Sequence, residues 1–183
     1  MGQVILGMSV SLDGFIHDRD GSVSRLYADL QEIDYKEQFQ DAIRMTGAVI
    51  MGRRSYEMGN GDFTGYEFQT PIFVVTHQPP EQVAKGENEN LKFHFVTDGV
   101  ERAVSQAKAA AGDKDVTVIG GAETIQQILN AGLGDELHID IVPVLLGEGL
   151  RLFDHLRNAP VALEQIQVNT MPKRTSIRYR IVK

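Results

Sequence analysis

An apolar segment that runs into two glycines and then into a helical pattern is the feature that most constrains the fold of this chain. Residues 116–119 read Val-Thr-Val-Ile, which predicts a buried strand, and Gly120 and Gly121 follow directly. Apolar residues then recur at helical spacing, at Ile125, Ile128 and Leu129. Glycine at such a junction lets backbone N–H groups approach a ligand closely at a helix N-terminus, which is how a diphosphate is held. The alternative is a turn that needs glycine only for its backbone torsion angles.

Composition indicates one globular domain and excludes several functional classes. A chain of 183 residues is long enough for one complete core and short for two, so we expect a single domain over residues 1–183. The net charge of −7 argues against a nucleic-acid partner, because phosphate contacts need clustered Lys and Arg. No apolar run approaches the roughly 20 residues that cross a bilayer, and the N-terminus does not read as a signal peptide. The absence of cysteine excludes disulfides and thiolate metal sites, and it fits a cytoplasmic protein.

Strand-like and helical patterns alternate along the chain, which predicts an α/β fold with a mainly parallel sheet and flanking helices. Residues 162–168 and 177–181 alternate apolar and polar side chains around a Met-Pro-Lys segment, which predicts a C-terminal antiparallel hairpin. Asp98 is the expected N-cap of the helix that begins near residue 100, and Gly112 is its expected end. Gly47 is the expected end of the helix that begins near residue 35. The other expected strands are 4–10, 48–51, 72–76, 93–97, 116–119 and 136–142, and helices are expected to begin near 35, 53, 100 and 122.

A second strand-to-helix junction carries two arginines. Met51 and Gly52 end a predicted strand, and Arg53, Arg54 and Ser55 follow at a helix start. Arginine offers a charged fork of donors that suits a phosphate monoester, and an arginine near the ribose is the usual way of accepting the 2′-phosphate of NADP. Ser55 would add a hydroxyl donor. The alternative is that both arginines are solvated surface residues.

A third polar segment, Thr76-His77-Gln78, follows the apolar residues 72–75. Open α/β sheets bind ligands beyond the carboxyl ends of their strands, so His77 could stack on adenine or approach the 2′-phosphate. An exposed loop histidine is the alternative. The chain contains no G-x-G-x-x-G, so the Rossmann fold is not indicated.

These segments, in this order, resemble known reductases. Residues 49–57 (Val-Ile-Met-Gly-Arg-Arg-Ser-Tyr-Glu) and 118–122 (Val-Ile-Gly-Gly-Ala) are similar to the cofactor motifs of dihydrofolate reductases, with 72–76 as the strand between them. Residues 8–16 (Met-Ser-Val-Ser-Leu-Asp-Gly-Phe-Ile) and 137–149 (Leu-His-Ile-Asp-Ile-Val-Pro-Val-Leu-Leu-Gly-Glu-Gly) more closely resemble the reductase domain of bifunctional riboflavin-biosynthesis enzymes. The resemblance covers nearly the whole chain.

The resemblance implies a dihydrofolate-reductase-like fold with NADPH lying across the strand ends. In the riboflavin-type relatives the region that matches 143–149 contributes to a two-fold dimer, so a homodimer is expected. The implied cofactor contacts are Val10, Leu12, Gly52, Arg53, Arg54, Ser55, Thr76, His77, Gln78, Ile119, Gly120, Gly121, Ala122, Glu123 and Thr124.

Departures from both families leave the substrate unassigned. Dihydrofolate reductases carry a tryptophan before the first helix, and this chain has none. Residues 60–68 lack the Asp-x-Pro and the downstream arginine with which the riboflavin enzyme binds its substrate. We therefore expect a stand-alone NADPH-dependent reductase of a small heterocyclic or carbonyl compound. Two alternatives stay open: an NADP(H)-binding sensor or accessory protein without turnover, and a phosphate-binding fold unrelated to dinucleotides.

Hydride transfer to a C=N or C=O carbon also needs a proton. Asp13, which follows the first strand, is the first candidate for this role, with an Asx turn as its alternative. Asp34, on the expected first helix, is the second candidate, with a solvated carboxylate as its alternative. Tyr56 is placed in the substrate pocket, with simple packing as its alternative.

Other polar residues are interpreted as structural. His138 alternates with apolar residues on a predicted strand, which is typical of a core or sheet-face histidine. His17, Asp18 and Asp20 are metal-binding residue types, but they lack the spacing of a helical pair or a defined metal loop. No metal is therefore expected.

Overall fold

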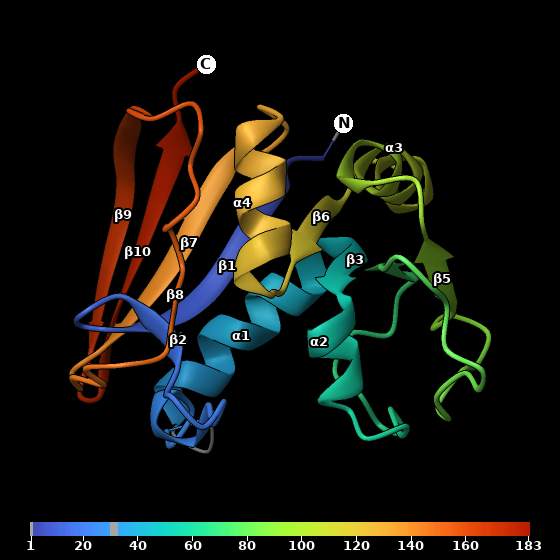
Figure 1. Cartoon of the computed structure of the whole chain (residues 1–183), viewed down its shortest axis with the longest axis horizontal. Coiled ribbons are helices and arrows are strands. Elements are labelled where there is room, and N and C mark those ends of the chain that lie inside the picture. The colour runs from blue at the N-terminus through green and yellow to red at the C-terminus, as the bar shows by residue number, and fades with distance from the viewer. Residues whose placement is uncertain (1, 30–32) are drawn as a thin grey trace.

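The computed structural model describes residues 2–29 and 33–183, and the side chains of the first helix from Phe39 onward. Its central sheet has the strand order β5-β4-β3-β6-β1-β7-β10-β9 (Figure 1). Neighbouring strands are parallel from β5 across to β7, whereas β10 is antiparallel to β7 and to β9. The α/β class, the mainly parallel sheet and the C-terminal hairpin are thereby confirmed.

The bounds of the elements agree closely with those expected from the sequence. The strands are β1 (Val4–Ser11), β2 (Phe15–His17), β3 (Thr46–Gly52), β4 (Ile72–Val75), β5 (Phe93–Val96), β6 (Asp115–Val118), β7 (Glu136–Val142), β8 (Leu150–Arg151), β9 (Leu163–Met171) and β10 (Arg174–Ile181). The helices are η1 (Ser24–Leu26, a 3-10 turn), α1 (Ile33–Met45), α2 (Arg53–Glu57), α3 (Val100–Ala111) and α4 (Ala122–Asn130).

Alternate side chains of β3 show how the helices cover both faces of the sheet. Ala48 and Ile50 belong to the core cluster that contains the apolar stripes of α3 and α4. Val49 and Met51 belong to a second cluster, which contains Tyr56 of α2 and apolar residues of α1. Successive side chains of a strand point to opposite faces, so α3 and α4 lie on one face and α1 and α2 on the other. The carboxyl ends of β4, β3 and β6 lie next to one another at one edge, and β1 extends five residues past the end of β6, whose Val118 pairs with Leu6.

Two of the expected helix ends were wrong. Gly99, with φ 92°, is the N-cap of α3, and no side chain caps that helix, so Asp98 does not cap it. Gly47 lies inside β3 rather than at the end of α1, which stops at Met45. The glycine is needed there for space, because a Cβ atom at this position would lie 2.7 Å from the carbonyl oxygen of Ala111.

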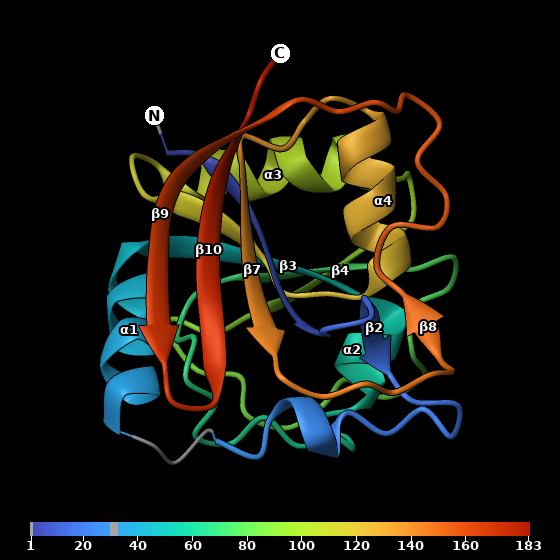
Figure 2. The ribbon, with the colours of Figure 1, turned by 90° about the vertical axis from the view of Figure 1, so that its left-hand side faces the viewer.

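The C-terminal hairpin lies at the edge of the sheet (Figure 2) and departs from regular alternation. Its register places Val168 opposite Ile177 but Gln165 opposite Tyr179, so Ile166 is an extra, unpaired residue. Such a bulge shifts the side-chain alternation by one position, and the single shared face expected for 162–168 is therefore wrong. The strand pair β2–β8 was not predicted, because two or three residues carry no readable periodicity.

No helix in the described ranges is long and apolar enough to cross a membrane.

Candidate functional site

The glycine junctions after β3 and β6 are joined to each other by backbone hydrogen bonds. The N–H of Gly52 donates to the carbonyl oxygen of Gly120 at 2.9 Å, and the N–H of Ile119 donates to that of Ile50 at 3.0 Å. Two predicted cofactor segments, about 70 residues apart in the sequence, thus form one surface at the strand ends.

Both junctions favour glycine, each for a different geometric reason. Gly120 has φ 112°, a conformation that L side chains rarely adopt, and the Gly120–Gly121 peptide is cis. A Cβ atom on Gly52 would lie 2.6 Å from the Thr124 hydroxyl, so any larger residue there would displace the buried side chain of Thr124. These contacts support the torsional explanation of the glycines, whereas the diphosphate explanation needs backbone N–H groups that are open to a ligand.

The N-terminus of α4 offers such donors. Gly121 is its N-cap, and no side chain caps the helix. The first N–H groups of a helix lack partners within it, so those of the first turn of α4 are available to an anion. Ala122 and Thr124 are buried and fix this turn, whereas the side chain of Glu123 is exposed. The Ser55 hydroxyl completes the surface, because it lies 3.0 Å from the point where a Cβ atom on Gly120 would stand.

The two arginines after β3 are exposed at the same edge. Arg53 makes a surface ion pair with Glu57, at 3.5 Å between Nε and Oε1. Exposed pairs of this kind are weak, so Arg53 can exchange its partner for a phosphate at little cost. Because α2 has only five residues, the arginine side chains, rather than the helix, supply the positive charge here.

The segment after β4 divides into one structural residue and two exposed ones. Thr76 is buried, its N–H donates to the Val96 carbonyl oxygen at 3.1 Å, and its hydroxyl donates to that of Gln78 at 2.8 Å. Thr76 therefore shapes the turn with its own polar groups. His77 and Gln78 are exposed beside it, where they are accessible to a ligand.

The last residues of β1 extend past the end of β6 and pair with β7, and their side chains have different environments. Val10 is buried in the core, whereas the side chain of Leu12 is 65% exposed. The carboxylate of Asp13 accepts hydrogen bonds from the Ser11 hydroxyl at 2.6 Å and from the N–H groups of Leu146 at 3.1 Å and Gly147 at 2.8 Å. The Ser11 hydroxyl, helped by these N–H groups, lowers the pKa of Asp13 to about 2. An aspartate with that pKa is ionised at neutral pH and has no proton to donate.

The structure corrects the placement of Tyr56 in a substrate pocket. Its ring is buried and stacks on Phe63 at a centroid distance of 5.5 Å, with the edges of Phe93 and Phe95 nearby. Its hydroxyl accepts the N–H of Ala84 at 2.7 Å. Tyr56 therefore packs the core. The backbone of Asp34 belongs to α1, but its side chain lies outside the described residues.

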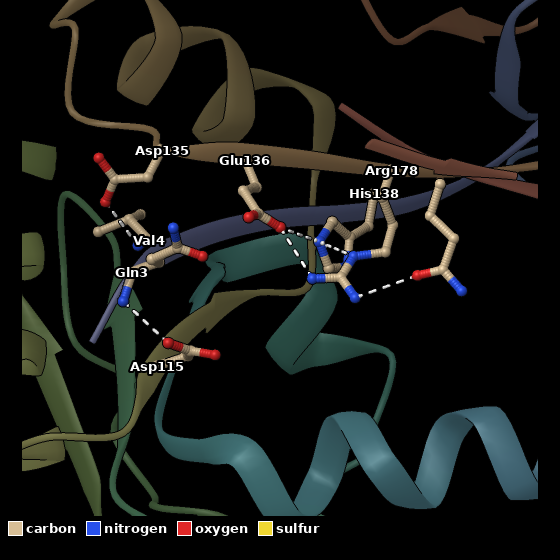
Figure 3. Close-up of polar contacts among 8 residues, drawn as sticks. Gln3, Val4, Asp115, Asp135, Glu136, His138 and Arg178 are labelled. Atoms are coloured by element: carbon tan, nitrogen blue, oxygen red, sulfur yellow. Dashed lines mark hydrogen bonds and ion pairs between the residues drawn. The ribbon is translucent and has the colours of Figure 1, made fainter. Parts of the chain in front are cut away.

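His138 lies on the sheet face and belongs to a polar group on neighbouring strands (Figure 3). Its Nε2 lies 2.8 Å from Oε2 of Glu136, and Arg178 donates to the same carboxylate oxygen at 3.0 Å. Burial lowers the pKa of His138, although Glu136 acts in the opposite direction. Among the residues that the structure describes, no group of histidine and carboxylate side chains is arranged to hold a metal ion.

A buried arginine network on the same strands was missed at the level of sequence. Arg174 is 2% exposed. Its guanidinium makes two contacts with the carboxylate of Asp29, one of them at 2.6 Å, and reaches Asp140 at 2.9 Å, Ser9 at 3.2 Å and the Leu26 carbonyl oxygen at 3.0 Å. Hydrogen bonds from Arg174 hold the pKa of Asp29 below its usual value, against the effect of burial. The network fastens the segment before α1 to the sheet next to β1.

The family model described as the RibD C-terminal domain matches residues 3–177 of the chain. The chain is 30% identical over 156 residues to the uncharacterized protein YyaP of Bacillus subtilis (strain 168), an overlap that covers 82% of this chain and 80% of YyaP.

Two solved structures confirm the dihydrofolate-reductase-like fold expected from the sequence. A putative riboflavin biosynthesis protein from Shewanella sp. PV-4 has a TM-score of 0.81 at 23% identity, with 99% of each chain covered. A diaminohydroxyphosphoribosylaminopyrimidine deaminase/5-amino-6-(5-phosphoribosylamino)uracil reductase from Thermotoga maritima has a TM-score of 0.70 at 16% identity, with 99% of this chain and 57% of that chain covered.

Proposed function

The chain belongs to the RibD C-terminal domain family, and from that premise we propose that it is an NADPH-dependent reductase of a small heterocyclic or carbonyl compound. The observation that carries the proposal is the joined surface of Gly52, Ser55 and Gly120-Gly121 at the uncapped start of α4. A glycine turn at a helix start that no side chain caps fits a diphosphate. The similarity to a named pyrimidine reductase of the same fold supports the reaction class.

Strand order suggests how the cofactor would lie. Arg53, Arg54 and His77 follow β3 and β4, and would bind the adenosine end with its 2′-phosphate. The glycine turn after β6 would bind the diphosphate. The strand beyond β6 is β1, so the nicotinamide end would lie near Val10, Leu12 and Asp13.

The division of the chemistry follows from these positions. NADPH supplies the hydride when bound, and the protein chain positions the cofactor and shields the site from water. Asp13 is ionised, so we do not propose it as the proton donor. Asp34, the second candidate, would need a proton relayed from water, because an ordinary aspartate is also ionised at neutral pH. Asp29 is not available for it, because its carboxylate is bound to Arg174.

A sensor or accessory protein that binds NADP(H) without turnover is the second candidate. It is favoured by one observation, that Asp13, the carboxylate that follows β1, is ionised. The two functions are separated by following NADPH absorbance with three acceptors: a 5-amino-6-(ribosylamino)uracil, a dihydropterin and a quinone. Enzyme-dependent oxidation that Gly52→Ala abolishes supports the reductase. Tight NADPH binding with no oxidation by any acceptor would favour the sensor.

The expected homodimer and cytoplasmic location belong to the same proposal. The side chain of Leu145, in the loop expected at a two-fold interface, is 70% exposed, so it would be accessible to a second copy of the chain. Light scattering during size-exclusion chromatography would give the mass of the particle, and a monomer with wild-type and Leu145→Asp chains alike would contradict the dimer.

A further inference from the structure

Asp13 joins two segments that are more than a hundred residues apart. Its carboxylate accepts the N–H groups of Leu146 and Gly147, and its carbonyl oxygen accepts a hydrogen bond from Arg151 at 3.0 Å. The N–H of the preceding Leu12 donates to the Val144 carbonyl oxygen at 2.9 Å. The loop 143–149 is therefore fastened at several points to the turn that follows β1.

The attachment continues on both sides of Asp13. On one side the Ser11 hydroxyl, which is buried, donates to the carboxylate and accepts the Phe15 N–H at 2.9 Å. On the other side β2 pairs with β8, and the Leu152 N–H donates to the Gly14 carbonyl oxygen at 3.1 Å. Of these contacts, those at the Asp13 carboxylate are the charge-assisted ones to backbone N–H groups, which are about twice as strong as neutral hydrogen bonds.

The position of this junction relates it to the cofactor surface. β1 runs past the end of β6, where the glycine turn begins, and β7 leads from the other side of β1 into the loop 143–149. Met8 of β1 reaches that turn, because its Cε atom lies 3.2 Å from the point where a Cβ atom on Gly120 would stand. The loop 143–149 also lines a hollow of about 560 Å³, together with residues 18–20 and Arg25.

We infer that Asp13 is a positioning residue that holds the loop 143–149 across the end of β1, where the joined segments form the wall of the nicotinamide half of the cofactor site. The inference rests on the proposed function, since it takes NADPH as the ligand. A carboxylate is suited to this task because it accepts two N–H groups and a hydroxyl at once without needing a proton of its own. The pKa of about 2 keeps it in that state throughout the physiological range.

The test compares NADPH with 2′,5′-ADP, which has the 2′-phosphate and adenosine but no nicotinamide. Asp13→Asn removes the charge and replaces one acceptor with a donor. We expect it to weaken NADPH binding about tenfold, as the loss of a charge-assisted contact predicts, and to change 2′,5′-ADP binding by less than about twofold. Asp62→Asn is the matched control, because Asp62 also accepts a loop N–H, from Thr64 at 2.8 Å, and its pKa is also lowered. It should change neither affinity.

A second measurement needs no ligand. Hydrogen exchange at residues 146 and 147 should accelerate in Asp13→Asn and stay unchanged in Asp62→Asn. If Asp13→Asn does not fold, Ser11→Ala, which removes the hydroxyl donor to the carboxylate, should show the same selective loss of NADPH affinity at smaller size. Equal changes for both ligands, or for neither, would overturn the inference. Failure of the wild-type chain to bind either ligand would instead refute the proposed cofactor.

Discussion

The buried network around Arg174 provides a quantitative test of how the segment before α1 is held. Arg174→Met keeps an extended side chain but leaves the carboxylates of Asp29 and Asp140 without their cation. The side chain of Arg174 is 0% exposed and that of Asp29 is 6% exposed, so water cannot replace the lost contacts. Removing one partner of a buried ion pair costs about 3–5 kcal/mol. At this chain length each kcal/mol lowers Tm by about 2–4 °C, so we expect a fall of about 6–20 °C.

Arg180→Met is the matched control for this prediction. Arg180 lies on the same strand and pairs with Glu164 at 2.6 Å, but these side chains are 55% and 60% exposed. An exposed pair is worth about 0–1 kcal/mol, so its loss should be small. Urea unfolding followed by circular dichroism gives both free energies. The double variant Asp29→Asn/Arg174→Met should lose less than the sum of its single changes, because each removes a charge that the other leaves unpaired. Equal small losses for both arginines would refute the reasoning.

Three further outcomes are expected. Gly52→Ala should weaken NADPH binding by at least about tenfold, because its Cβ atom would stand 2.6 Å from a threonine hydroxyl. Gly7→Ala, whose Cβ atom would lie 3.7 Å from its nearest neighbouring atom, should bind NADPH normally in the same fluorescence titration. The contribution of the Asp13 carboxylate to stability should be fully present above about pH 4 and lost as pH falls toward its folded pKa of about 2, since a depressed pKa favours the folded state only while the group is ionised. Thermal unfolding of wild-type and Asp13→Asn chains between these pH values measures that loss. Plots of Tm against pH that run parallel for the two chains would contradict it. Tyr56→Phe should cost about 1–3 kcal/mol in urea unfolding, because it strands the buried N–H of Ala84, and it should leave NADPH affinity unchanged; a large loss of affinity with intact stability would restore Tyr56 to the ligand site.

Most of the fold could be predicted from local patterns in the sequence. The apolar runs before Gly52 and Gly120 predicted strands whose ends meet at one edge, because parallel strands place their carboxyl ends together. Their mutual hydrogen bonds followed from that arrangement. The position of Gly47 was misjudged because a glycine that ends a helix and a glycine that makes room for a neighbouring backbone look alike in one sequence.

The roles of side chains were predicted less well, because they depend on residues far away in the sequence. Asp13 reads as part of an Asp-Gly turn, but its carboxylate is bound by N–H groups more than a hundred residues later. Arg174 follows a Pro-Lys turn and looks exposed, yet it is buried against Asp29. The available signal was the alternation of β10, which places Arg174 and Ser176 on the face opposite Ile177. No pattern in the sequence around Arg174 shows that the segment with Asp29 covers that face.

Binding of NADPH against NADH to the purified protein tests the central claim most directly. Nicotinamide fluorescence at fixed salt gives both dissociation constants, with Arg53→Ala and Arg54→Ala measured beside the wild type. We expect a clear preference of the wild type for NADPH, and we expect the arginine variants to lose it while they still bind NADH, because only the 2′-phosphate distinguishes the two cofactors. Wild-type protein that binds neither cofactor would contradict a cofactor site at these strand ends, and equal binding of both would contradict the role given to Arg53 and Arg54.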